Sequence, residues 1–206
     1  MITVLDYGAG NTASILNMMR KVGLEAESSL SPEVLGKSKA IIFPGVGAFD
    51  NGMKKIRDSG VWELLNELVL DRKIPFLGIC LGMQMLFESS EEGNEKGFGW
   101  LPGTVRRFDF SDSKVNKIPH MGWNLVNASK DNPLFESLHD ENRFYFVHSF
   151  HVECDDAKHS VASTHYGYDF TCCVQKENIF GVQFHPEKSH RFGMAFFRNF
   201  SNFLQC

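Results

Sequence analysis

The stretch PFLGICLGMQMLF, residues 75–87, decides the fold, because a single cysteine interrupts a long apolar run with a glycine two residues away on each side. The first part of the run predicts a buried strand and the second part a helix. Gly-Ile-Cys-Leu-Gly at 78–82 is typical of a nucleophile elbow, in which glycines leave space for a sharply turned backbone. Cys80 is then expected at a strand-to-helix turn, where the helix start favours a thiolate. A buried core cysteine fits the pentapeptide equally well.

Outward from this turn, the first half of the chain alternates short apolar strands with amphipathic helices, which indicates a parallel sheet covered on both faces. Strands are expected in ITVLD (2–6), near 24–27, in AIIF (40–43) and in IPFLGI (74–79), and helices over 11–21, in SPEVLGKS (31–38) and over 61–72. After SSEEGNEKG (89–97), strand-like runs dominate, including RFYFVHSFHVE (143–153) and TCCVQKENIFGVQF (171–184), before a closing helix from His190 to Leu204. We expect an α/β fold with a mostly parallel central sheet, flanking helices and a strand-rich second half, and residues 1–206 as a single domain.

Composition narrows the class of function. The 206 residues carry a net charge of −4 without a cluster of Lys or Arg, which argues against nucleic acid and anionic membranes as partners. The first residues resemble no signal peptide, and no run reaches the ~18 apolar residues of a membrane span. Five cysteines without a CxxC pair suggest neither a disulfide framework nor a zinc site. A cytoplasmic protein that acts on small molecules or proteins is expected.

A base for the cysteine is offered by GVQFHPEKS, residues 181–189, at the end of a predicted strand. Pro186 biases His185 toward an extended backbone, in which residues two apart point the same way, so that Glu187 can orient the imidazole. Cys80, His185 and Glu187 are therefore predicted to form a catalytic triad. A surface His-Pro-Glu turn is the alternative for the tripeptide alone.

Donors for an oxyanion are predicted from two glycine-flanked segments. The first is the N–H of Leu81, next to the nucleophile, and the second is the loop Pro-Gly-Val-Gly at 44–47, with Val46 and Gly47 as the donors. Both would lie at the carboxyl edge of the parallel sheet, where open α/β folds place their sites. An ordinary turn fits the same loop.

A metal site is not expected. His148 and His151 in HSFH would lie on opposite faces of one strand, because side chains alternate along it. No residue pattern requires a cofactor.

Taken together, YGAGN (7–11), FPGVGAF (43–49), GICLGMQ (78–84), PHMGWN (119–124), FVHSF (146–150) and GVQFHPEKS (181–189) resemble the class I, or triad, glutamine amidotransferases over nearly the whole chain. Within that family the motifs are most similar to the glutaminase subunits of imidazole glycerol phosphate synthases. The resemblance implies hydrolysis of glutamine at Cys80 through a glutamyl thioester, with His185 moving the proton and Glu187 orienting it. It also implies that ammonia passes through a tunnel to a (β/α)8-barrel cyclase subunit, in a heterodimer that serves histidine biosynthesis.

The resemblance also assigns binding residues. Against the substrate it places Gly45, Gln84, His148, Ser149 and Phe150, and at the partner surface it places Asn11, Met121, Trp123, Asn124 and Lys188. Gln84, four residues after Cys80, shares a helix face with it and needs a hydrogen-bond partner, although a bond to the backbone alone would also satisfy it. Trp123 has the composition of an interface hot spot, and a core position is the alternative.

Three rival functions fit parts of the pattern. Phe150 stands where the family usually has tyrosine, and GFGW, YGYDF and EKSH also depart from the commonest forms, which is compatible with a paralogue that supplies ammonia for surface-sugar amidation. A free-standing cysteine hydrolase would use the same elbow and base, but would not need PHMGWN or Gln84. A non-catalytic binding module is disfavoured because all three triad residues are present.

Overall fold

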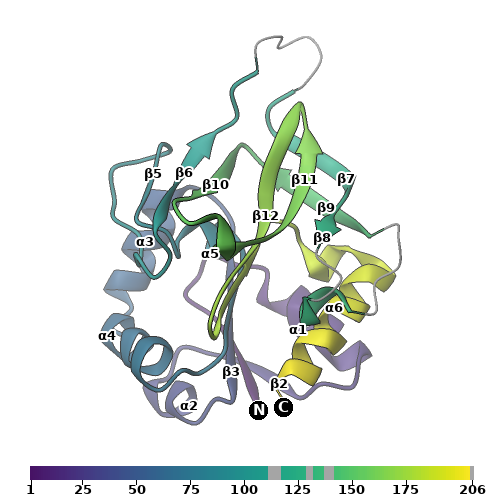
Figure 1. Cartoon of the computed structure of the whole chain (residues 1–206). Coiled ribbons are helices and arrows are strands. Elements are labelled where there is room, and N and C mark those ends of the chain that lie inside the picture. Colours follow the sequence, from purple (N-terminus) through teal and green to yellow (C-terminus); the bar gives the residue numbers. More distant parts are fainter. Residues whose placement is uncertain (111–116, 129–131, 137–141, 205–206) are drawn as a thin grey trace.

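The computed structural model describes residues 1–110, 117–128, 132–136 and 142–204. Its core is a large mixed sheet (Figure 1), whose first half is parallel because helical crossovers connect its strands. In spatial order the parallel strands are β2 (Ala26–Ser29), β1 (Ile2–Leu5), β3 (Ala40–Gly45), β4 (Phe76–Cys80) and β13 (Ile179–Val182). The α/β fold with a strand-rich second half is confirmed.

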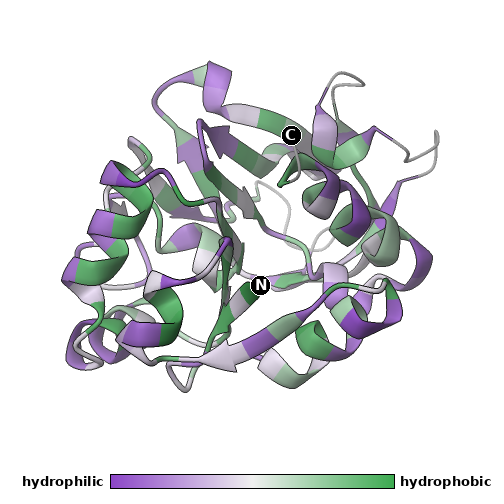
Figure 2. Ribbon diagram, turned by 90° about the horizontal axis from the view of Figure 1, so that it is seen from below, coloured by the Kyte–Doolittle hydropathy of each residue, from purple (hydrophilic) through white to green (hydrophobic). Residues whose placement is uncertain are grey.

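Helices cover both faces of this sheet (Figure 1). One face carries α1 (Thr12–Lys21) and α6 (His190–Phe203), and the other carries α2 (Pro32–Gly36), α3 (Phe49–Asp58) and α4 (Trp62–Asn66), which continues into a π-helical turn at Glu67–Asp71. The short helix α5 (Leu81–Gln84) follows β4 directly. Hydrophilic and hydrophobic bands alternate around the outer helices in Figure 2, as expected of helices with one buried face.

The second half of the chain continues the sheet with mainly antiparallel strands, which need only short turns between them. These are β12 (Tyr168–Lys176), β10 (Phe150–Cys154), β6 (Gly103–Arg107) and β5 (Ser89–Ser90), with β11 (Ser160–Tyr166) and β8 (Asn127–Ala128) off the main path. A separate two-stranded sheet pairs β7 (His120–Leu125) with β9 (Arg143–His148). Single 3-10 turns occupy Pro133–Phe135, Ala157–His159 and Pro186–Lys188.

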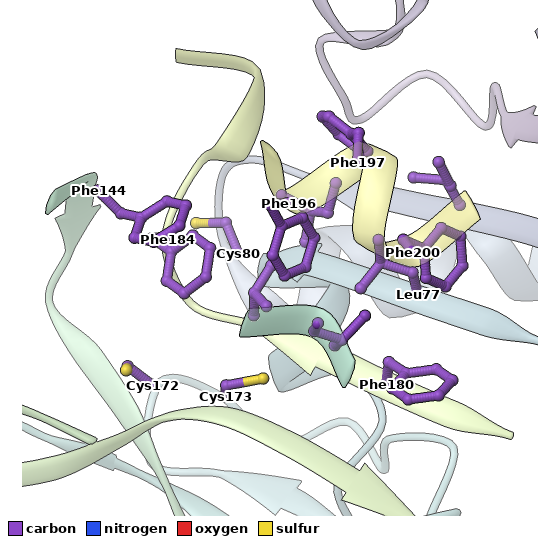
Figure 3. Close-up of a cluster of buried hydrophobic side chains, with 14 of the residues drawn as sticks. Leu77, Cys80, Phe144, Cys172, Cys173, Phe180, Phe184, Phe196, Phe197 and Phe200 are labelled. Atoms are coloured by element: carbon purple, nitrogen blue, oxygen red, sulfur yellow. The ribbon is translucent and has the colours of Figure 1, made fainter. Parts of the chain in front are cut away.

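A phenylalanine-rich cluster holds the end of β13 against α6 (Figure 3). Phe144 and Phe184 stack with ring centroids 4.0 Å apart, and Phe196 from α6 meets Phe184 edge-on at 5.7 Å. Phe184 is fully buried and directly precedes His185. Because aromatic packing of this kind fixes ring positions, the cluster anchors the backbone that carries the predicted base.

The sequence-based boundaries need four corrections. Helix α3 was not predicted, although Phe49, Met53 and Ile56 recur at helical spacing, because most of its other residues are polar. The predicted strand at 24–27 is β2, which begins two residues later, and the predicted helix at 61–72 ends in a π turn. RFYFVHSFHVE is two strands, because the chain bends at Ser149.

No helix in the described ranges is both long enough and apolar enough to cross a bilayer.

Candidate active site

Cys80 occupies the sharp turn between β4 and α5. Its φ of 55° and ψ of −112° lie outside the regions that residues with a side chain favour, which is the strain expected of a nucleophile elbow. The flanking glycines are needed for close approach: a Cβ on Gly82 would lie 1.9 Å from the carbonyl oxygen of Phe43, and one on Gly78 would lie 2.7 Å from that of Gly82. The strand-to-helix turn predicted at Cys80 is therefore confirmed.

His185 and Glu187 are paired as predicted. His185 Nδ1 lies 2.8 Å from Glu187 Oε1, and the two side chains are only 3% and 2% exposed. His185 is extended, whereas Glu187 belongs to the 3-10 turn that Pro186 begins. The pairing thus comes from a tight turn after the histidine and not from a continuous extended chain.

The backbone around His185 is clamped to β9. The His185 N–H donates to the Tyr145 carbonyl at 2.8 Å, and the Ser189 hydroxyl donates to the His185 carbonyl at 2.6 Å. The same hydroxyl accepts from the Tyr145 N–H at 3.0 Å. Ser189, which sequence reasoning did not single out, therefore ties the histidine to the sheet that carries the pocket wall.

The electrostatics favour a protonated His185. Burial opposes a charge on His185, but its interactions with the Cys80 sulfur and with Glu187 outweigh burial and raise its pKa to about 10. His185 Nε2 has no hydrogen-bond partner among the described residues. The imidazolium N–H is therefore available to a group that enters the site next to the cysteine.

A cavity of about 340 Å³ opens over Cys80. It gathers most of the residues predicted for the site, namely Val46, Gly47, Cys80, Leu81, Gln84, His148, Ser149, Phe150, His185 and Lys188. Gly45 lies behind the wall, where a Cβ would approach the Gly82 nitrogen to 2.6 Å, and Glu187 lies behind His185. The fold therefore brings together segments that are up to about 140 residues apart in the chain.

The predicted partner residues lie at the surface close to this cavity. On β7 the side chains of Met121 and Trp123 are 62% and 45% exposed, so the core alternative for Trp123 is wrong. Trp123 stacks on His190, and Lys188 lies over the ring of Tyr145. Leu125 was not predicted, but it extends the same face by the period-two alternation of β7.

The two predicted asparagines have structural partners of their own. Asn11 caps α1, because its side-chain oxygen accepts from the N–H of Ser14 at 3.3 Å. Asn124 donates to the carbonyl of His165 at 2.8 Å. Their role toward a partner stays a prediction.

The comparisons with known proteins cover nearly the whole chain. The family Glutamine amidotransferase class-I matches residues 3–203. The chain belongs to this family. It is 46% identical to the imidazole glycerol phosphate synthase subunit HisH of Leptospira borgpetersenii, covering 98% of this chain and 100% of the relative. It is 48% identical to subunit HisH 2 of Methanococcus maripaludis, covering 97% and 98%.

Solved structures show the same amidotransferase fold. A crystal structure of a glutamine amidotransferase matches with a TM-score of 0.73 at 20% identity, over 100% of this chain and 99% of the other. A glutamine amidotransferase from Thermotoga maritima matches with a TM-score of 0.63 at 20% identity, over 99% and 83%.

In the loop at 44–47, one of the two N–H groups predicted to bind an oxyanion already has a partner. The N–H of Val46 donates to the carbonyl of Ala9 at 3.0 Å, so this donor is occupied. Gly47 has a φ of 98°, and a Cβ built on it would meet nothing within 4 Å. The backbone at Gly47 thus adopts a conformation that favours glycine, and a hydrogen bond to Ala9 holds the neighbouring Val46.

Sequence reasoning missed Glu92, which lines the cavity. One of its carboxylate oxygens accepts from the N–H of Phe49 at 2.8 Å, at the start of α3, and this bond fixes the side chain. Glu92 lies in the SSEEGNEKG segment, where several acidic residues look alike. Only the packing of α3 distinguishes it.

The expectation for His148 and His151 was wrong in its geometry. Because of the bend at Ser149, both rings lie against Phe108, at centroid distances of 5.2 and 4.9 Å, instead of on opposite faces. His148 pairs with His120 at 2.9 Å. Within the described ranges, no cluster of three or more His, Cys, Asp or Glu side chains has the arrangement of a metal site.

Proposed function

We propose that this chain is the glutaminase subunit of an imidazole glycerol phosphate synthase, and that it hydrolyses glutamine and passes ammonia to a (β/α)8-barrel cyclase subunit in a heterodimer. The observation that carries the proposal is the buried Cys80–His185–Glu187 arrangement, whose nucleophile and base open into one cavity beside an exposed apolar face. Full-length identities of 46–48% to subunits of that name support the pathway. Residues 1–206 form one glutaminase domain in this proposal.

The charged and polar groups of the cavity wall suit the binding of glutamine. Glu92 supplies a carboxylate that suits the α-ammonium group of glutamine. The side-chain NH2 of Gln84 is used by the Phe150 carbonyl at 3.1 Å and by Gln183 at 3.0 Å. Its oxygen is left to accept a hydrogen bond from the substrate. The backbone of Gly45 shapes the wall through its contact with α5, and His148, Ser149 and Phe150 form the opposite lining.

In the reaction, the Cys80 thiolate attacks the side-chain amide carbon of glutamine and forms a tetrahedral oxyanion. His185 then gives its Nε2 proton to the amide nitrogen, the C–N bond breaks, ammonia leaves and a glutamyl thioester remains. Neutral His185 next takes a proton from water, which attacks the thioester. Collapse of that intermediate releases glutamate and restores the thiolate and imidazolium. Glu187 holds the ring throughout.

Regulation would act on the oxyanion loop. The Leu81 N–H is fixed at the start of α5, whereas the Val46 N–H is bonded to Ala9. Binding of the liganded partner would turn the peptide between Gly45 and Gly47, so that an N–H faces the oxyanion. Each such donor contributes ~2.7–4 kcal/mol of transition-state stabilisation. The isolated chain is therefore expected to hydrolyse glutamine slowly.

The partner would dock on the face formed by Met121, Trp123 and Leu125, with Asn11, Asn124 and Lys188 around it. A contiguous exposed apolar face beside an active site is typical of a protein interface. Lys188 follows Glu187 directly and also lines the cavity. A partner contact that moves Lys188 would therefore act on the neighbouring triad residue.

The test is to measure glutaminase activity of the purified chain alone, with the cyclase subunit, and with the cyclase subunit plus its acceptor substrate. A rise at the last step is expected. A high rate without any partner would instead support a free-standing hydrolase. Activation only by a barrel subunit from a surface-sugar cluster would support the paralogue. As a control, Leu70→Ala changes an exposed apolar residue outside this face and should leave activation unchanged.

A further inference from the structure

Gln183 contacts the nucleophile from inside the core. It is fully buried, follows β13, and its backbone N–H donates to the Cys172 carbonyl at 2.9 Å. Its side-chain Nε2 lies 3.7 Å from the Cys80 sulfur. Gln183 is not part of the cavity wall, so its contact with the sulfur is made from the protein side and not through the substrate.

The orientation of the Gln183 amide is fixed by one backbone carbonyl. The Phe150 oxygen can only accept, so the Gln84 atom 3.1 Å from it must be the NH2 group. That same NH2 lies 3.0 Å from Gln183, which must therefore present its oxygen there. The NH2 of Gln183 is then the group that faces the sulfur. Reversing either amide would set two donors or two acceptors against each other.

The carbonyl itself is held by a second chain of hydrogen bonds. His148 Nδ1 lies 2.7 Å from the Phe150 oxygen and must carry the proton, so His148 Nε2 accepts from His120 Nδ1 at 2.9 Å. Burial lowers the pKa of His148 to about 3 and that of His120 to about 4, so both rings are neutral. The Phe150 carbonyl therefore keeps two donors, His148 and Gln84, in place.

We propose that Gln183 is a positioning residue for the nucleophile, which holds the Cys80 sulfur in its reactive rotamer and stabilises the thiolate by donating a side-chain N–H. A hydrogen bond to the charged form favours that form over the neutral thiol. The other ionisable groups that interact with the sulfur are His185, whose pKa the sulfur and Glu187 raise although burial opposes it, and Tyr7, whose pKa is raised by burial and by the sulfur. Gln183 adds a neutral donor that keeps its N–H throughout turnover, whereas His185 gives up its Nε2 proton.

Two substitutions separate this role from simple packing. Gln183→Glu keeps the shape and the oxygen that accepts from Gln84, but it puts an oxygen in place of the NH2 beside the sulfur. Gln183→Met keeps most of the volume and removes the donor. Gln175→Met is the matched control, because Gln175 also accepts a side-chain hydrogen bond, from Asn132 at 3.0 Å, but lies outside the cavity.

The primary measurement is the rate at which iodoacetamide alkylates Cys80 in the full chain as a function of pH, which needs neither glutamine nor the partner. Both Gln183 variants should move the pH of half-maximal alkylation upward by about one to two units, with Glu showing the larger shift. The control variant should follow the wild type. Unfolding in urea, measured in parallel, shows whether each variant is folded.

The second measurement rests on the proposed glutaminase function: kcat should fall about ten- to hundredfold in Gln183→Met, with KM for glutamine changed by less than about threefold. An unchanged alkylation profile in a folded Gln183→Met protein would overturn the proposal, even if its stability falls. If Gln183→Glu does not fold, the methionine variant decides alone. Absence of glutamine turnover in the wild type would refute the proposed function and leave the alkylation test intact.

Discussion

Gly193 in the first turn of α6 controls the position of the triad, and Gly193→Ala should therefore impair catalysis from outside the cavity. A Cβ at this position would lie 1.8 Å from the carbonyl oxygen of Pro186 and 2.7 Å from its carbonyl carbon. Pro186 begins the 3-10 turn that carries Glu187. The clash is with backbone, so rotation of a side chain cannot relieve it.

The size of the effect follows from the required movement. Contacts of this kind essentially never fall below 3.0 Å, so α6 and the 3-10 turn must separate by roughly 1.2 Å. Overpacking of this kind destabilises a protein by about 1–3 kcal/mol. A displacement of about 1 Å in a catalytic group lowers the rate by about 10²-fold. Both effects are expected in one variant.

The assay is kcat/KM for glutamine in the complex with the cyclase subunit, together with the free energy of unfolding in urea. Gly36→Ala is the control, because a Cβ there meets no atom within 4 Å. Wild-type kcat/KM and stability in Gly193→Ala would refute the reasoning. A destabilised variant with wild-type kcat/KM would show that α6 moves and the triad does not, which contradicts the catalytic half of the prediction.

Four further predictions concern the site itself. Cys80→Ala should abolish glutamine-dependent turnover while the complex still uses added ammonium salts, and any remaining glutaminase activity would exclude Cys80 as the nucleophile. His185→Asn should reduce kcat far more than Glu187→Gln, because the ring transfers the proton and the carboxylate only orients it; equal losses would contradict these roles. The raised pKa of His185 stabilises the fold below pH 6.5, and this contribution should be lost as pH rises through about 10. The free energy of unfolding in urea should therefore fall less over this pH range in His185→Asn than in the wild type. The lowered pKa of His148 acts at acid pH: it should make stability fall as pH drops from 6.5 toward 3, by up to roughly 1.4 kcal/mol per pH unit. His148→Leu should reduce the slope of stability against pH in this range, and the part due to His120 should remain.

Residues close together in the chain account for what could be predicted. The glycines around Cys80 and the spacing of His185 and Glu187 are local features, and the triad was predicted by combining these two separate local patterns. The alternation of apolar runs predicted the parallel half of the sheet for the same reason. Helix α3 was missed although Phe49, Met53 and Ile56 recur at helical spacing, because the segment holds few apolar residues and its other positions are mostly polar.

The sequence by itself determined the α/β sheet, and it predicted Cys80 as the nucleophile and His185 as its base. Only the tertiary structure decided what surrounds the sulfur: Gln183 faces Cys80 across 103 positions, and His120 meets His148 across 28. It also decided that the Val46 N–H is held by Ala9. A hydrogen bond depends on where two atoms lie to within a few tenths of an ångström, and that is set by strand register and side-chain packing over the whole sheet, which local patterns do not encode.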